Sequence, residues 1–139
     1  RMTNMQAALG CAQMDRISEL LERKKQIFNM YNANLTGIPG ISINRTYDWA
    51  TNAYWLMCME IESYNEEKRD VFMQRLKERG VDSRPYFYPM SAMPYLKQAN
   101  TPVTHAVSQK GINLPTYFDM TEEEVEHVCR VIKQLLSSE

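Results

Sequence analysis

The segment that most restricts the fold of this chain is residues 84–95, RPYFYPMSAMPY, which contains three prolines and four aromatic residues. Each proline lacks an amide donor and disfavours helical backbone in the residue before it, so a helix cannot run through this segment. We expect a short strand that leads into a stiff loop walled by aromatic rings, with Arg84 at its entrance. Such a loop suits a flat or sugar-like ligand that carries phosphate. An aromatic core strand with a proline stop is the competing interpretation.

The composition is that of a globular domain. Of the 139 residues, 44% are hydrophobic and 24% are charged, which suffices for one hydrophobic core. The formal net charge of -1 argues against a nucleic-acid or membrane partner, and no apolar run approaches the roughly 20 residues of a membrane-spanning helix. The cysteines, Cys11, Cys58 and Cys129, form no CxxC pair. This usage favours a reduced, cytoplasmic protein with buried thiols.

The first part of the chain has a helical pattern. Thr3 and Gln6 have the spacing of a capping box, and apolar residues then recur at helical spacing as far as Leu35. We predict one long helix within residues 1–36, about 45 Å in length at ~1.5 Å per residue. Its small residues near the start indicate close packing against a partner outside this chain.

Residues 37–139 are predicted to form a small α/β (α+β) domain, in which a short, mostly antiparallel sheet of three to four strands is backed by helices. Alternating apolar residues indicate strands at 41–43, 54–62 and 81–88, with a further extended piece at 112–115. Trp55, Met57, Met59 and Ile61 are expected to share one face. Capping and turn residues indicate helices that begin at Asn65 or Ser63, at Thr101-Pro102 and at Thr121.

Several motifs together resemble one protein family. These motifs are residues 1–10 with Gln13, residues 52–55 (NAYW), residues 80–84 (GVDSR), residues 84–95 and Leu114-Pro115. In this order the chain resembles the C-terminal part of the DegT/DnrJ/EryC1/StrS aminotransferases, in particular their perosamine-synthase branch. The resemblance covers essentially the whole chain.

The resemblance implies the C-terminal small domain of a fold type I transferase that depends on pyridoxal phosphate. Such an enzyme transfers an amino group from glutamate or glutamine to a keto-sugar carried on a nucleotide, in the synthesis of cell-surface polysaccharide. The resemblance also implies a homodimer, in which a larger N-terminal domain outside this chain holds most of the cofactor. We therefore expect a fragment that is not catalytic on its own.

Three residues of the aromatic tract are candidates for substrate contact. Arg84 could bind a phosphate or a sugar hydroxyl, and an ion pair with Asp82 or Asp119 is the alternative. Tyr88 and Ser91 could offer hydroxyls to a sugar, and hydrogen bonds within the loop are their alternative. Many members of the family have a histidine in place of Ser91.

Two further candidates lie at the start of the chain. The resemblance implies that Arg1 and Asn4 reach across a two-fold dimer interface towards the neighbouring subunit's cofactor phosphate and substrate. Residues offered in this way would make dimerisation necessary for activity.

No catalytic or metal-binding residue is expected in this chain. A pyridoxal-phosphate transaminase needs a partly desolvated lysine, whereas Lys97, the one lysine near a plausible pocket, is expected to be solvated. His105 and His127 lack metal-ligand spacing. The other lysines are expected on polar helix faces or in the last turn of a helix: Lys24, Lys25, Lys68, Lys77, Lys110 and Lys133.

Two other functional classes remain open. A non-catalytic regulator could keep the family's fold and bind a ligand without turnover. A stand-alone interaction domain could use the long helix to dimerise, because the apolar face of such a helix needs a partner.

Overall fold

The structure, a computed structural model, describes residues 1–138. The elements run in the order α1 (Asn4–Asp15), α2 (Ile17–Leu35), β1 (Ile41–Ile43), β2 (Met57–Ile61), α3 (Glu66–Lys77), β3 (Arg84–Pro85), the 3₁₀ turn η1 (Met90–Ala92), α4 (Pro102–Lys110), β4 (Gly111–Leu114) and α5 (Glu122–Leu136). Neighbouring strands pair antiparallel in the order β1-β2-β4-β3. The predicted α/β class, with a short antiparallel sheet backed by helices, is confirmed.

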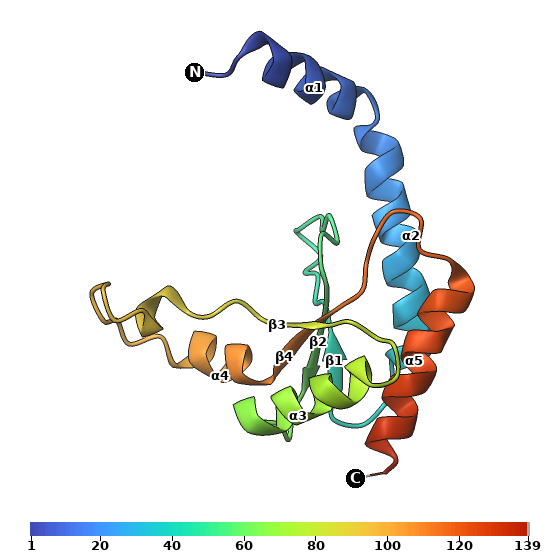
Figure 1. Cartoon of the computed structure of the whole chain (residues 1–139), viewed down its shortest axis with the longest axis vertical. Coiled ribbons are helices and arrows are strands. Elements are labelled where there is room, and N and C mark those ends of the chain that lie inside the picture. Colours follow the sequence, from blue (N-terminus) through green and yellow to red (C-terminus); the bar gives the residue numbers. More distant parts are fainter. Residues whose placement is uncertain (139) are drawn as a thin grey trace.

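The hydrophobic core lies on one face of the sheet. Met57 pairs with Leu114 and Met59 with Ile112, so these side chains point to the same side of the two central strands. They are buried against α2 and α5, which lie side by side in Figure 1, and against the apolar face of α3. The prediction of a shared buried face is confirmed for Met57, Met59 and Ile61.

The same prediction is wrong for Trp55, whose side chain is 67% exposed. Strand β2 begins only at Met57, and Tyr54 has a positive φ of 49° that ends any extended run before it. Trp55 therefore lies in the loop that precedes β2. Its ring stacks on that of Phe87, with the centroids 6.3 Å apart.

Local capping signals place the helices of the domain correctly. At α5 the Thr121 hydroxyl accepts a hydrogen bond from the Glu124 amide, and the Glu124 carboxylate accepts one from the Thr121 amide. Asn65, the first of the two alternatives, caps α3. Helix α4 begins at Pro102 and ends before Gly111, as predicted.

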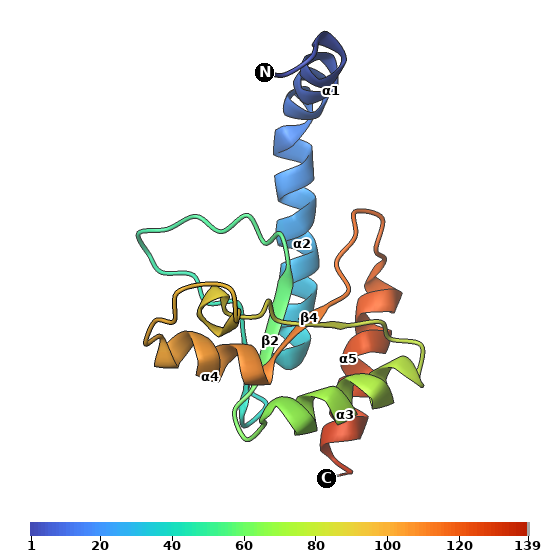
Figure 2. The same ribbon diagram turned by 60° about the vertical axis from the view of Figure 1, so that its left-hand side comes forward.

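The single long helix that the sequence predicts is divided into α1 and α2 at Arg16, which has φ -104° and ψ 4°. None of the 12 residues of α1 is buried, so no packing holds α1 in line with α2. Arg16 instead pairs with Glu19 in the first turn of α2 and lies over the Phe118 ring. Figures 1 and 2 show α1 and the first turns of α2 projecting away from the sheet.

The cysteine on α1 and those in the rest of the domain differ in burial. Cys129 is buried, and burial raises its pKa to about 11. Burial also raises the pKa of the half-buried Cys58 thiol. Cys11 is exposed because it lies on α1, so the prediction of buried thiols is wrong for this residue. Within residues 1–138, no helix has the length and apolar character that crossing a membrane requires.

The predicted strand at 81–88 pairs with its neighbour only at Arg84–Pro85. Pro85 and Pro89 have no amide to donate, so the ladder stops after one further bond from the Tyr86 amide to the Gly111 carbonyl. The Tyr86 ring then lies directly on Gly111, where a Cβ atom would overlap it. Gly111 is needed here for this close approach and not for its own backbone conformation.

Substituting Gly111→Ala should therefore force the Tyr86 ring away from the sheet and lower the free energy of unfolding by about 1–3 kcal/mol, as overpacking does. Urea denaturation followed by circular dichroism would measure the loss. Gly10→Ala is the matched control, because a Cβ atom there meets no other atom and alanine favours the helix. Equal stability of G111A and the unchanged chain would contradict the close approach.

Candidate functional site

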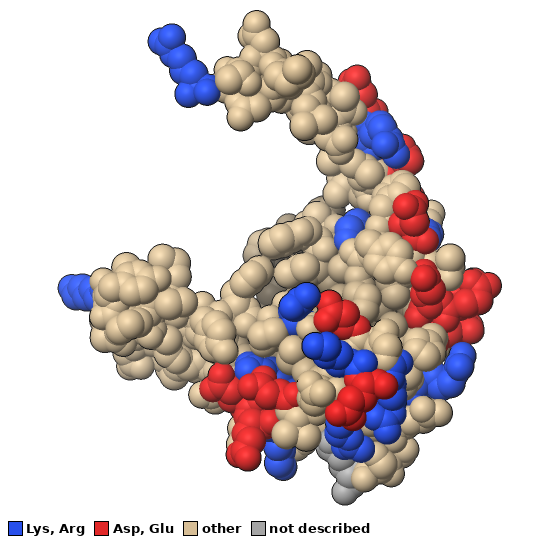
Figure 3. All heavy atoms as spheres, in the orientation of Figure 1, with Lys and Arg blue, Asp and Glu red and all other residues tan. Residues whose placement is uncertain are grey.

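The described chain has a wide, open concave side. Figure 3 shows it between α1 on one side and the body of the domain on the other, bordered mainly by uncharged side chains. Acidic and basic side chains gather instead over α3 and α5. Between Asn4 and Asp15, α1 carries one charged residue, Asp15, and it exposes Met5, Leu9 and Met14. A helix of this kind presents an uncharged surface suited to packing against protein.

The aromatic segment, residues 84–95, runs from the sheet edge to η1 and then turns back towards α4 (Figure 1). Phe87 and Tyr88 are 72% and 59% exposed, whereas Pro89 between Tyr88 and η1 is buried. The segment is thus a loop of exposed rings, as predicted. The alternative of an aromatic core strand is wrong for these two rings.

The hydroxyl of Ser91 is held by the start of α4. Its Oγ lies 2.6 Å from Thr101 Oγ1 and 2.9 Å from His105 Nε2. These partners belong to the N-cap and first turn of α4, so the hydrogen bonds of the Ser91 side chain are not bonds within the loop itself. Sequence reasoning treated His105 only as a failed metal ligand and missed this contact. The spacing of Thr101 and His105, one helical turn apart just after the loop, was the available signal.

Arg84 makes the ion pair with Asp82 that the sequence left open, at 3.1 Å between the guanidinium and the carboxylate. The two side chains are 76% and 68% exposed, and exposed pairs of this kind contribute little, about 0–1 kcal/mol. Arg84 borders a shallow pocket of about 240 Å³ beside Gln74 and Lys77 of α3. The guanidinium is therefore accessible to a ligand at little cost in lost ion pairing.

A second pocket, of about 430 Å³, lies between α4 and the sheet. Its lining is mostly apolar and includes Leu56, Tyr86, Phe87, Val103, Val107 and Asn113. At its polar end the Cys58 thiol donates to Asn113 Oδ1 at 3.4 Å, while Asn113 Nδ2 donates to the Pro85 carbonyl. Burial raises the pKa of both the Cys58 thiol and the Tyr86 hydroxyl, so both stay protonated at neutral pH.

The predicted site residues do not converge in this chain. Arg1 and Asn4 are exposed at the start of α1, and in Figures 1 and 2 this end lies apart from the aromatic segment. Arg84 lies beside α3, and Ser91 beside α4. Tyr88 is exposed between them.

The lysines of residues 1–138 do not form a cofactor site. Lys97 is exposed. Lys24, predicted on a polar helix face, is instead half-buried and donates to the carbonyls of Trp55 and Thr116 and to the Thr116 hydroxyl. Burial lowers the pKa of the Lys24 amine, but its donors are already used in holding these two loops to α2. The described residues also contain no group of side chains that could hold a metal ion.

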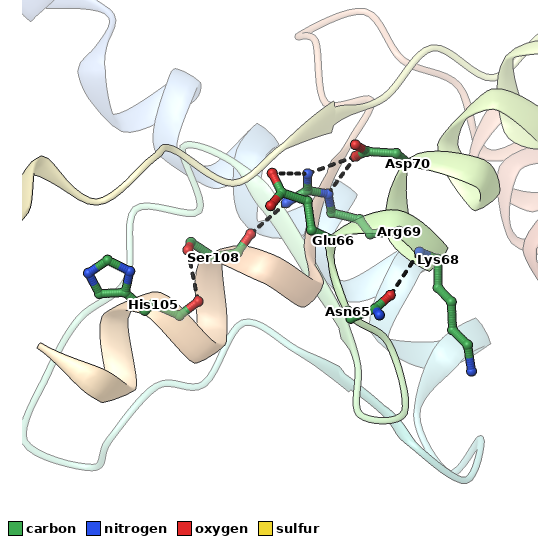
Figure 4. Close-up of polar contacts among 7 residues, drawn as sticks. All are labelled: Asn65, Glu66, Lys68, Arg69, Asp70, His105 and Ser108. Carbon is green, nitrogen blue, oxygen red and sulfur yellow. Dashed lines mark hydrogen bonds and ion pairs between the residues drawn. The ribbon is translucent and has the colours of Figure 1, made fainter. Parts of the chain in front are cut away.

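Helix α4, which holds Ser91, is itself attached through Arg69 of α3 (Figure 4). The Arg69 side chain is only 2% exposed. Its guanidinium donates to the Ser108 carbonyl at 2.7 Å, to the Asp70 carboxylate at 2.7 and 2.9 Å and to Glu66 at 3.4 Å. A buried guanidinium needs such partners to offset its lost hydration.

Comparison with known proteins identifies relatives of the chain. A family model described as the DegT/DnrJ/EryC1/StrS aminotransferase family matches residues 1–133. The chain is 31% identical over 137 residues to a GDP-perosamine synthase of Vibrio cholerae, covering 96% of this chain and 37% of that protein. It is 30% identical to a dTDP-4-amino-4,6-dideoxy-D-glucose transaminase of Escherichia coli, covering 95% and 38%.

A solved structure agrees in fold. A putative sugar aminotransferase of Streptococcus pneumoniae, in its PLP form, superposes with a TM-score of 0.89 at 24% identity, covering 99% of this chain and 36% of that chain. The chain thus spans a little over a third of the length of the proteins it matches.

Replacing Arg69 by methionine should leave the Ser108 carbonyl without its donor and lower the free energy of unfolding by about 1–3 kcal/mol. Urea denaturation gives the total loss, and hydrogen exchange should show faster exchange in α4 than in α5. Arg16→Met is the matched control, since Arg16 makes an exposed ion pair and should change the midpoint little. Identical midpoints and exchange for the two variants would show that Arg69 does not anchor α4.

Proposed function

The chain belongs to the DegT/DnrJ/EryC1/StrS aminotransferase family, and from this premise we propose that it is the C-terminal domain of an enzyme that aminates a keto-sugar on a nucleotide. The observation that carries the proposal is the match over residues 1–133, together with relatives named for GDP- and dTDP-linked amino sugars. Glutamate or glutamine is the proposed amino donor. A cytoplasmic role in cell-surface polysaccharide synthesis is the proposed setting.

Pyridoxal phosphate is the cofactor of this proposal, and when bound it supplies the electron sink that transamination needs. The described residues do not fit it, because none of their lysines offers a desolvated amine with a free donor. We therefore assign the cofactor mainly to residues outside this chain. This assignment agrees with the fact that the chain spans only about 37% of its relative from Vibrio cholerae.

The exposed, uncharged surface of α1 supports a second part of the proposal. Residues 1–36 would join the domain of residues 37–139 to a larger domain and to the interface of a homodimer. Arg1 and Asn4 would then approach the neighbouring subunit's site, while Arg84, Tyr88 and Ser91 would contact the substrate of their own subunit.

The first test concerns the cofactor. The longer protein that contains this chain should bind pyridoxal phosphate with an absorbance band that borohydride removes while fixing the cofactor covalently, because a lysine outside residues 1–139 holds it. Residues 1–139 alone are the matched control and should show neither effect. A longer protein that binds nucleotide-sugar but never captures the cofactor would instead be a non-catalytic regulator of the same fold.

The second test concerns Arg84 in the longer protein. Arg84→Ala should raise KM for the nucleotide-sugar about tenfold or more, the effect of losing one charge-assisted hydrogen bond. Asp82→Asn is the control, because it breaks the same ion pair but keeps the guanidinium, and KM should stay within about twofold. If R84A and D82N have the same KM, Arg84 makes no contact with the substrate and contributes only through its ion pair with Asp82.

A further inference from the structure

The part of the aromatic segment that contains η1 is connected to the domain by a series of hydrogen bonds through α4. Arg69 donates to the Ser108 carbonyl at 2.7 Å, and the Ser108 hydroxyl donates to the His105 carbonyl at 2.9 Å (Figure 4). The ring of the same histidine places Nε2 2.9 Å from Ser91 Oγ. A continuous path therefore connects a buried guanidinium to an exposed loop.

Other contacts hold the first half of this loop, because Pro89 before η1 is buried and the Phe87 ring stacks on Trp55. The backbone hydrogen bonds of η1 are internal, from Ala92 to Pro89 at 2.9 Å and from Met93 to Met90 at 3.1 Å. They fix the shape of the turn but not its place relative to α4. Ser91 supplies that connection with its two side-chain contacts, to Thr101 and to His105.

The chemistry of the Ser91 hydroxyl suits a site held ready for a ligand. A hydroxyl has one proton and two lone pairs, which gives three hydrogen-bonding positions. Thr101 and His105 use two of them, whichever tautomer the imidazole adopts. One position remains, and the oxygen that carries it is fixed before any ligand arrives. Such fixing reduces the ordering cost of binding.

We propose that His105 is a positioning residue, which holds Ser91 and the turn Met90–Ala92 so that the aromatic segment receives the sugar in a fixed geometry. This role rests on the proposed function for the identity of the ligand. The imidazole acts through Ser91 and does not touch the substrate. It therefore adds a specificity element from α4 to a loop that lies 14 residues earlier.

The kinetic arm of the test uses the longer protein with pyridoxal phosphate. His105→Ala should raise KM for the nucleotide-sugar about fivefold, as expected for one neutral hydrogen bond, with kcat changed less. His105→Gln should stay within about twofold, because its amide can reach the place of Nε2. Ser91→Ala, which also removes the proposed substrate contact, should raise KM at least as much as H105A, and the double variant should be no worse than S91A alone. Independent, multiplying effects of the two substitutions would overturn the proposal.

The structural arm does not depend on activity. Chymotrypsin cleavage after Phe87 should be several-fold faster in H105A than in the unchanged protein and should return to the original rate in H105Q. Thermal unfolding of each variant checks that the domain stays folded. An unchanged cleavage rate in H105A would overturn the positioning role. Faster cleavage in a protein that shows no cofactor band and no transamination would keep the positioning role and discard the proposed function.

Discussion

The placement of α4 and of the aromatic segment that it contacts depends on one buried guanidinium. Helix α4 contributes no fully buried side chain, so apolar packing alone does not fix it against α3. Arg69 supplies the missing connection through the Ser108 carbonyl, and the exposed carboxylates of Asp70 and Glu66 balance its charge. Directional donors of this kind select one placement of a helix where apolar contact would tolerate several. As a consequence, the positions of α4 and of the Ser91 turn that it contacts depend on a few polar atoms.

The same helix also determines where the aromatic segment leaves the sheet. Gly111 ends α4 and begins β4 without an intervening loop, and its missing side chain admits the ring of Tyr86. The sheet edge, the end of α4 and the first ring of the segment therefore meet at one point. From there Phe87 and Tyr88 extend into solvent, and Ser91 returns the chain to α4. A displacement of α4 would move both ends of the loop together.

The sequence could predict those parts of the structure that are determined by residues close to one another along the chain. The capping box at Thr121 and the alternation of Met57 and Met59 identify a helix and a strand from a few adjacent residues. Lys24 could not be placed in this way, because the Thr116 atoms to which its amine donates lie 92 residues further along. The contact between Ser91 and His105 is likewise tertiary. The break at Arg16 reflects missing packing around α1, which a helical pattern cannot reveal.

The separation of the candidate ligand contacts has a consequence for assembly under the proposed function. Arg1 and Asn4 belong to the N-terminal end of the chain, and this end lies apart from the aromatic segment, which contains Tyr88 and Ser91, in both views (Figures 1 and 2). If all four contact one ligand, they cannot come from the same copy without moving α1. Two copies related by a two-fold axis satisfy the requirement, because each N-terminal end can then reach its partner's loop. The surface of α1, which is almost free of charge, suits such a contact. The projection of α1 away from the domain separates the candidate residues within one chain, and the same projection would bring them to the partner's loop in a dimer.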